Sequence, residues 1–427
     1  MNRGLEVEEH ARRLAAGLGV PDFVYRPVNA SKGSGAREIS DGLLVAGDAG
    51  LILQVKSREP GAAATDTPER ATSWVTKTFA AGLRQAAGSR RALAAGSTVR
   101  FVSMRGYERT LPPGADWPAV VLVDHPHAPP IEIRRVPNAL CMTMGDWMNL
   151  HDRLRSTASV IEYAHRALDS RLHPRLGEEQ RRYMRLAQAD SEYASRPGSL
   201  PIVPLDRPTQ EELFAVAVFD DLVERVADPA NEPWDEHNYL HVVELLDGQP
   251  ILLRAEIGAK MLDTFKKVRA ERKPRGFTML DRQVGDRLVF YYDVEEAENP
   301  PDLDELHIAE IAAYGCLRHI QALETGAAKD TKTLAVGIRH HELRGRRYAF
   351  ALYAGSPPPM AAETRRALEA DHGVYDHGRG RTTSWYPGRN QLCPCGSGRK
   401  YKHCCLARRS GARAARQAPT NAASPKV

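Results

Sequence analysis

The stretch REISDGLLVAGDAGLILQVKSR, residues 37–58, constrains the fold of this 427-residue chain more than any other. Two runs rich in Leu, Val and Ile, residues 38–46 and 51–57, flank the turn-forming sequence GDAG. Short runs of this composition on either side of Gly and Asp are typical of antiparallel strands joined by a tight turn. The stretch therefore predicts a β-hairpin with Asp48 and Ala49 at its turn.

The hairpin belongs to a longer α/β pattern. Residues 5–18 and 74–93 have the apolar spacing of helices, and the runs VRFVSM and AVVLVD predict buried strands. Residues 145–195 are again helical in pattern and heavily charged. We therefore expect a first α/β domain over residues 1–195, with a helical extension at its end.

A second domain is predicted beyond a proline-rich linker. Residues 196–209 hold four prolines, which is typical of a domain boundary. The elements expected after it are helices at 210–226, 252–271 and 303–323, and strands at 287–294, 333–339 and 347–355. They indicate an α/β domain over residues 210–375 with no phosphate-binding loop. The chain as a whole is thus expected to be α/β (α+β).

The positive charge of the chain lies at its C-terminal end. Residues 388–427 contain nine Lys or Arg and no Asp or Glu, which leaves 50 basic against 54 acidic side chains elsewhere. A short segment of one charge is typical of a nucleic-acid or acidic-partner contact, or of a solubilising tail. Residues 411–427 are poor in large apolar side chains, so we expect a disordered basic tail.

Neither a membrane span nor a secretion signal is evident. The sequence has no run of about eighteen consecutive apolar residues, which a transmembrane helix requires. The initial residues MNRGLEVEEHARRL lack the apolar centre of a signal peptide. A cytoplasmic location without membrane contact is therefore expected.

Four of the six cysteines, Cys393, Cys395, Cys404 and Cys405, lie within thirteen residues, CPCGSGRKYKHCC. In a reducing compartment such a cluster indicates a metal site rather than disulfides. Four thiolates at tetrahedral corners suit Zn²⁺ and leave no open position for water, so we expect a structural zinc site. The remaining two cysteines, Cys141 and Cys316, stand alone in apolar surroundings and are expected to be small core residues.

The wording NQLCPCGSGRKYKHCC closely resembles the SEC-C motif found at the C-terminal end of the SecA preprotein translocase and on many unrelated bacterial proteins. We assign the motif to residues 388–410. The resemblance implies zinc binding and docking onto a protein partner such as a chaperone or the ribosome. The export motor itself is not expected, because the chain has no G-x-x-x-x-G-K-[ST] sequence and is too short.

The predicted hairpin also brings together polar side chains. With the turn at Asp48-Ala49, Leu43 lies opposite Gln54 and Asp41 opposite Lys56. Opposed residues, and residues two apart, share one face of a sheet, so Asp41, Gln54 and Lys56 converge. The other face is apolar and carries Leu44, Leu51, Leu53 and Val55.

These three side chains suit a hard cation and a phosphate-bearing substrate. Asp41 is expected to hold Mg²⁺ through oxygen, with the Gln54 side-chain carbonyl or the neighbouring main-chain carbonyl as a further ligand. Lys56 then either orients or deprotonates a water molecule, or stabilises the charge of a pentacovalent phosphate.

The pattern resembles the PD-(D/E)XK nuclease superfamily, whose core is helix–strand–strand–strand–helix–strand with an acid on the second strand and (D/E/Q)-x-K on the third. Asp41 and Gln54-Val55-Lys56 match it here, and the Gln variant is similar to the Mrr type of restriction endonuclease. The resemblance covers roughly residues 5–140. It implies a restriction-endonuclease-like core, catalytic roles for these three residues and Mg²⁺ as cofactor. The expected partner is nucleic acid, with DNA favoured over RNA. The helix after the hairpin carries Lys77, Arg84, Arg90 and Arg91.

Several departures from the family pattern bear on this hypothesis. Ser40 stands where the family has Pro, and Gln54 replaces an acid, so the site has one negative charge fewer and should bind metal more weakly. Glu38 points to the opposite face of a regular strand. Glu8 or Glu9 on the first helix is the candidate for an additional carboxylate.

A structural explanation competes with catalysis. A half-buried hairpin with polar residues on its solvent face would also bring Asp, Gln and Lys together. The histidines at 125, 127, 340 and 341 lack metal-ligand spacing, so we expect them to be exposed or hydrogen-bonded.

The sequence therefore supports two hypotheses of different functional classes. The first is a Mg²⁺-dependent nuclease-like protein with a zinc-binding tail, serving restriction, repair or phage defence. The second is a non-catalytic adaptor whose zinc module docks onto a chaperone or ribosome. A redox or metal-storage role is disfavoured by the closed cysteine site.

Overall fold

The structure is a computed structural model that describes most of the chain. The described residues are 3–27, 30–32, 35–37, 39–94, 100–110, 117–133, 136–170, 172–194, 203–226, 236–272, 275–280, 286–293, 305–324, 331–341, 345–356 and 359–371. The predicted zinc site, the predicted disordered tail and Glu38 lie outside these residues.

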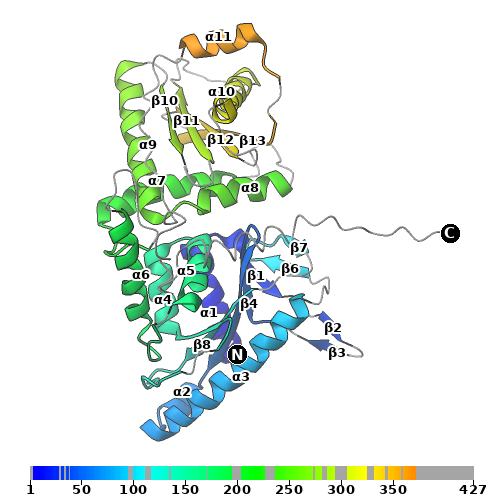
Figure 1. Cartoon of the computed structure of the whole chain (residues 1–427), viewed down its shortest axis with the longest axis vertical. Helices are drawn as coiled ribbons and strands as arrows, with labels where there is room; N and C mark the ends of the chain where they lie inside the picture. Colours follow the sequence, from blue (N-terminus) through cyan, green and yellow to red (C-terminus); the bar gives the residue numbers. More distant parts are fainter. Residues whose placement is uncertain are drawn as a thin grey trace, which may run out of the picture.

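A seven-stranded mixed sheet with the order β7-β6-β1-β4-β5-β8-β9 forms the centre of the first half of the chain (Figure 1). Its strands are β1 (Val24–Pro27), β4 (Gly42–Ala46), β5 (Ala49–Ser57), β6 (Arg100–Ser103), β7 (Glu108–Thr110), β8 (Ala119–Asp124) and β9 (Ala139–Thr143). Strand β4 pairs antiparallel with β1 and β5, whereas β5, β8 and β9 run parallel. A separate hairpin consists of β2 (Ala30–Lys32) and β3 (Gly35–Arg37).

Helices cover both faces of this sheet. The long helix α3 (Pro68–Ala94) packs on one face, against the apolar side chains of β5 and β8. The other face is covered by α1 (Arg3–Leu18), α4 (Met144–Leu154) and α5 (Thr157–Asp169), and α6 (Glu179–Ala194) lies further along the chain. Short helices are η1 (Pro21–Phe23) and α2 (Pro60–Ala63).

Along the chain the central elements follow the order α1, β1, β4, β5, α3 and β8. The hairpin β2-β3 is inserted before β4, and strands β6 and β7 are inserted before β8. This order gives three antiparallel strands followed by a helix that returns the chain to a parallel fourth strand.

A second, four-stranded sheet follows, with the order β10-β11-β12-β13. Its elements are α7 (Gln210–Val226), α8 (Glu236–Asp247), α9 (Ile251–Glu271), β10 (Arg275–Leu280), β11 (Arg287–Asp293), α10 (Glu305–Glu324), β12 (Lys332–His341), β13 (Gly345–Ala354) and α11 (Ala362–Asp371). Helix α10 packs on one face, and α7 and α9 pack on the other. In Figure 1, α7 and α8 lie between the two sheets, and α9 runs alongside the second sheet.

The two halves are packed directly against each other. One apolar core cluster contains side chains from both sheets, including Leu53 of β5 and Leu334 of β12. The predicted linker is packed too where it is described, since the Val203 N–H donates to Asp190 Oδ2 at 3.0 Å and the Tyr183 hydroxyl donates to the Pro204 carbonyl at 2.9 Å. The junction is thus continuous with the protein core.

The mixed α/β class predicted from the sequence is confirmed. None of the helices in the described ranges is long and apolar enough to cross a membrane. Both isolated cysteines are free; Cys316 is buried as expected, and Cys141 is half-buried.

Candidate functional site

The hairpin β4-β5 positions the candidate catalytic residues. Its turn lies one residue earlier than predicted, at Gly47-Asp48, and Leu43 pairs with Ile52 rather than with Gln54. Gly47 has φ +57, and a Cβ atom there would collide with the Glu244 carboxylate of α8. Glycine therefore satisfies both the left-handed backbone and the close contact.

The predicted register was wrong by two residues, but the predicted faces are right. A shift of two keeps the alternation of side chains, because that alternation has a period of two. Leu44, Leu51, Leu53 and Val55 lie in the core beneath α1, α4 and α5, as expected. Leu43 and Ile52 lie beneath α3, on the face that Gln54 and Lys56 share by alternation.

Asp41 and Lys56 contact each other. The Lys56 Nζ lies 3.5 Å from Asp41 Oδ2, and the two side chains are 23% and 11% exposed. The same Oδ2 accepts the main-chain N–H of Val55 at 2.5 Å. Strand β4 begins at Gly42, so it offers Val55 no main-chain carbonyl. The Asp41 carboxylate accepts the Val55 N–H in place of such a carbonyl.

The main chain around Asp41 is fixed from two sides. The Asp41 N–H donates to the Leu53 carbonyl at 3.1 Å, and the Arg12 guanidinium of α1 donates to the Asp41 carbonyl. In an antiparallel pair the N–H and C=O of one residue point the same way, so the Val55 carbonyl faces the Asp41 side. Oδ1 of Asp41 has no hydrogen-bond partner among the residues that the structure describes.

Gln54 lies on the same face but contacts the helix above it. Its Nε2 lies 3.4 Å from the Ser89 Oγ of α3, and the residue is only 3% exposed. Ser89 in turn donates to the Ile39 carbonyl, just before β4. The face that carries Asp41 and Gln54 is therefore covered by α3, and the alternative of a solvent-facing hairpin is wrong.

The candidate additional carboxylates on α1 are engaged elsewhere. Glu9 accepts hydrogen bonds from Arg13 at 2.8 Å, Arg26 at 3.0 Å and Arg12 at 3.2 Å. Partial burial acts to raise the pKa of Glu9, but the hydrogen bonds from Arg13 and Arg12 outweigh it and hold that pKa below its ordinary value. Glu8 also has an interaction partner. Within the described ranges, no group of three or more His, Cys, Asp or Glu side chains could hold a metal ion.

A second polar cluster, which the sequence did not predict, follows Lys56 at the carboxyl ends of β5 and β8. Arg58 donates two hydrogen bonds to Asp66, at 2.9 and 3.0 Å, and lies over the Trp74 ring. His125 Nε2 lies 3.3 Å from Asp66, and His125 Nδ1 accepts the N–H of His127 at 3.0 Å.

The chemistry of this second cluster follows from its hydrogen bonds. The Arg58 guanidinium is the main reason that the pKa of Asp66 lies below its ordinary value. His125 links the two other parts of the cluster, because its Nε2 faces Asp66 and its Nδ1 faces the main-chain N–H of His127. His125 is hydrogen-bonded, as predicted. Only the contacts across the fold reveal this cluster, since Arg58, Asp66 and His125 have no motif spacing.

The segment that carries the cysteine cluster is similar to known proteins. Residues 389–407 match the family model of the SEC-C motif. Over 24 residues the chain is 75% identical to the protein translocase subunit SecA 1 of Chlorobium chlorochromatii (strain CaD3), which is 6% of this chain and 2% of that subunit. No solved structure matches the chain significantly.

The predicted SEC-C motif is therefore confirmed, and this motif is of a zinc-binding type. The matched stretch covers only a small part of the translocase subunit. The resemblance of residues 5–140 to the PD-(D/E)XK nuclease superfamily stays a prediction, because both matches fall on the C-terminal segment.

Proposed function

We propose that this protein is a Mg²⁺-dependent, nuclease-like phosphodiesterase that acts on nucleic acid and docks to a partner through its zinc-binding SEC-C motif. The observation that carries the proposal is the contact of Asp41 with Lys56 on neighbouring strands of a helix–strand–strand–strand–helix–strand core. Lys56 is the more exposed of the two side chains, at 23% against 11% for Asp41.

The donor set around Asp41 suits Mg²⁺. Oδ1 of Asp41 lacks a partner in the described part of the chain, and the Val55 carbonyl faces the same side. Mg²⁺ is commonly held by one or two carboxylates together with waters and substrate phosphates. When bound, the ion supplies Lewis-acid stabilisation of the phosphate oxygens. The Gln54 carbonyl is the further candidate ligand.

Lys56 supplies the protein's own charge to the reaction. As an ammonium group held by Asp41, Lys56 can stabilise negative charge on the phosphate oxygens or orient the attacking water; as the neutral amine it can accept the proton of that water. Arg12 holds the Asp41 main chain, and Ser89 holds Gln54, so the site is supported from both covering helices.

The test is Mg²⁺-dependent cleavage of plasmid DNA and of single-stranded DNA and RNA by the full chain. We expect Lys56→Ala to reduce the cleavage rate at least about 100-fold, as removal of a charge-stabilising group commonly does. Its thermal unfolding should stay cooperative. Lys266→Ala on α9, an exposed lysine far from β5 in the chain, is the matched control. Equal cutting by Lys56→Ala would sink the assignment.

A second candidate function is favoured by the same geometry. Oδ2 of Asp41 is already bonded to Val55 and Lys56, and the Gln54 amide is bonded to Ser89. These contacts suit a non-catalytic adaptor whose fold is a scaffold and whose SEC-C motif captures a chaperone or ribosome. If the protein is such an adaptor, it should cleave no nucleic acid with Mg²⁺ or Mn²⁺. A Cys404→Ser, Cys405→Ser variant should fail to capture the partner protein.

A further inference from the structure

Helix α3 carries a stripe of unpaired positive charge on its outer face. Arg70, Lys77, Arg84 and Arg91 are all exposed and are spaced seven residues apart over the 27-residue helix. Seven residues are close to two turns, so the four side chains project from one side over about 30 Å. The buried residues of α3, which include Val75, Phe79 and Ala86, lie on the opposite side.

The stripe lacks the acidic partners that some other exposed basic residues of the described chain have. Arg13, Arg181 and Lys267 each pair with an acid three or four residues away. Glu69 is the one acid in α3, and the four stripe residues make no ion pair with any part of the chain that the structure describes. Their charges are therefore available to a partner.

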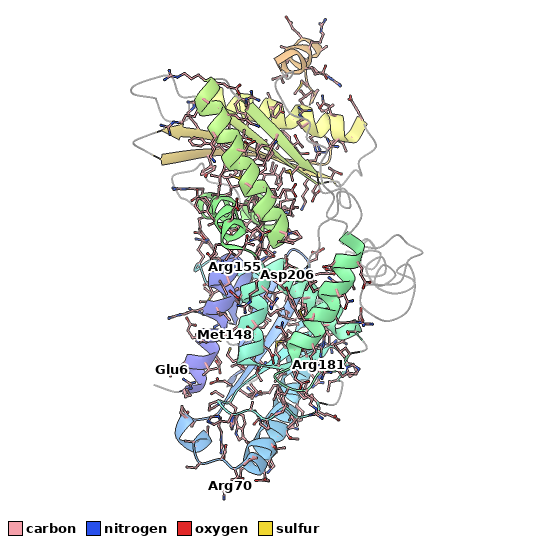
Figure 2. The ribbon with its side chains drawn as sticks, turned by 90° about the vertical axis from the view of Figure 1, so that its left-hand side faces the viewer. Glu6, Arg70, Met148, Arg155, Arg181 and Asp206 are labelled. Carbon is pink, nitrogen blue, oxygen red and sulfur yellow. The ribbon has the colours of Figure 1, made fainter. Side chains whose placement is uncertain are left out.

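Small side chains run beside the stripe. Ser73, Ala80, Ala87 and Ala94 each lie three residues after a stripe residue, which makes them neighbours on the helix surface. A bulky partner can therefore approach the helix closely between the long basic side chains. Figure 2 shows Arg70 projecting outward at the lower end of the molecule, where α3 begins.

We infer that the face of α3 formed by Arg70, Lys77, Arg84 and Arg91 is a docking surface for the phosphate backbone of duplex nucleic acid. A regular array of unpaired cations matches a backbone with regularly spaced negative charges. The exposed large apolar residues of the described chain are Leu5, Tyr107, Met148, Met184 and Phe214. None is on α3, whereas protein partners favour aromatic and Met contacts and single strands favour aromatic stacking.

The surface recognises the charge and shape of the duplex rather than its base sequence. Arginine and lysine contacts to phosphates position a duplex without carrying sequence information. The stripe faces away from the sheet that carries Asp41 and Lys56, so it holds the nucleic acid independently of chemistry at that site. The inference rests on the proposed function only in taking nucleic acid as the ligand.

The experiment measures binding of the full chain to a labelled DNA duplex by fluorescence anisotropy as a function of salt. The stripe variant is Arg70→Gln, Lys77→Gln, Arg84→Gln, Arg91→Gln. Each phosphate contact makes the slope of log affinity against log salt concentration steeper by about 0.9. The slope of the stripe variant should therefore be shallower than the wild-type slope by about 3–4. Each single substitution should remove about 1. An RNA duplex in the same assay establishes which duplex is bound more tightly.

The control variant removes the same charge from other surfaces: Arg181→Gln, Lys266→Gln, Lys267→Gln, Arg366→Gln, all exposed in the structure. It should keep the wild-type slope. An unchanged slope in the stripe variant, or an equal loss in the control, overturns the inference. Lys56→Ala separates the two proposals. Stripe-dependent binding without cleavage refutes only the nuclease assignment, and cleavage without stripe-dependent binding refutes only the docking surface.

Discussion

Asp247 of α8 and Arg254 of α9 form a buried ion pair at the junction of the two halves, with 2.9 Å between Asp247 Oδ1 and Arg254 Nη2. The two side chains are 0% and 3% exposed. The Asp247 carboxylate also accepts the main-chain N–H groups of Thr157 at 3.2 Å and Ala158 at 2.8 Å. A residue of the second half thus caps the first turn of α5 in the first half, where N–H groups lack helical partners.

Replacing Asp247 by Ala should lower the free energy of unfolding by about 3 kcal/mol, because it leaves two N–H groups of α5 unpaired and leaves the buried Arg254 with only the part-exposed Asp220 as its ion-pair partner. Urea denaturation of the full chain measures this. Asp263→Ala, which breaks the half-exposed pair with Lys267, is the control and should cost less than about 1 kcal/mol. Equal costs would show that Asp247 does not hold the junction.

His151 of α4 gives stability a pH dependence at mildly acid pH. It is fully buried against Trp147, and neither ring nitrogen has a hydrogen-bond partner among the described residues. Burial lowers the pKa of His151 to about 3, from an ordinary 6.5. As the pH falls from 6.5 toward 3 the unfolded chain takes up a proton that the folded chain refuses, so the free energy of unfolding falls by up to about 1.4 kcal/mol per pH unit. His151→Leu should remove this contribution in urea titrations at several pH values. An identical pH profile in the variant would contradict it.

Glu179 at the start of α6 acts in the opposite direction. Burial raises the pKa of Glu179 from 4.5 to about 7, although Arg182 and the Tyr163 hydroxyl at 2.7 Å oppose the shift. Between pH 4.5 and 7 the folded chain keeps a proton that the unfolded chain releases, so stability falls as the pH rises. Glu179→Gln should abolish that fall.

In the overlapping range, pH 4.5 to 6.5, the effects of His151 and Glu179 oppose each other. In His151→Leu the effect of Glu179 remains, so the free energy of unfolding should fall as the pH rises through this range. In Glu179→Gln the effect of His151 remains, so the free energy of unfolding should rise with pH. Stability that changes in the same sense in both variants would refute the assignment of these two groups.

Much of the first sheet is predictable because its strands are short apolar runs with clear ends. Strand β8 occupies residues 119–124 as expected, and the predicted helix at 210–226 is α7. Strand β1 was missed because it has four residues, VYRP, with a proline and no visible alternation. It is nevertheless the first strand of the core and is held by pairing with both β4 and β6.

At the candidate site, the local sequence pattern predicts the face of the sheet on which a side chain lies but not what covers that face. The alternation along β5 assigns Gln54 to a polar face, but sequence alone cannot tell whether solvent or a helix covers that face. The contact of Gln54 with Ser89 joins residues 35 positions apart and depends on how α3 returns across the sheet. The Arg58–Asp66–His125 cluster likewise arises from the packing of three loops, so the spacing of these residues in the sequence does not predict it.

The SEC-C motif predicts the metal content of the protein. A purified full chain should contain one zinc ion, because Cys393, Cys395, Cys404 and Cys405 supply four thiolates, the ligand set of a closed structural site. Cys404→Ser, Cys405→Ser should lose the metal in an elemental analysis. Cys316→Ser, a buried cysteine of α10 outside the motif, should retain it.

Zinc removal should leave the two sheets folded. The motif begins after the last described helix, α11, and both sheets are completed by strands that end before it. Chelation should therefore abolish partner capture without changing the thermal unfolding of the rest of the chain. A large drop in unfolding temperature on chelation would instead show that the motif packs against the α/β body and stabilises it, since a structural zinc contributes its binding energy to whatever folds around it.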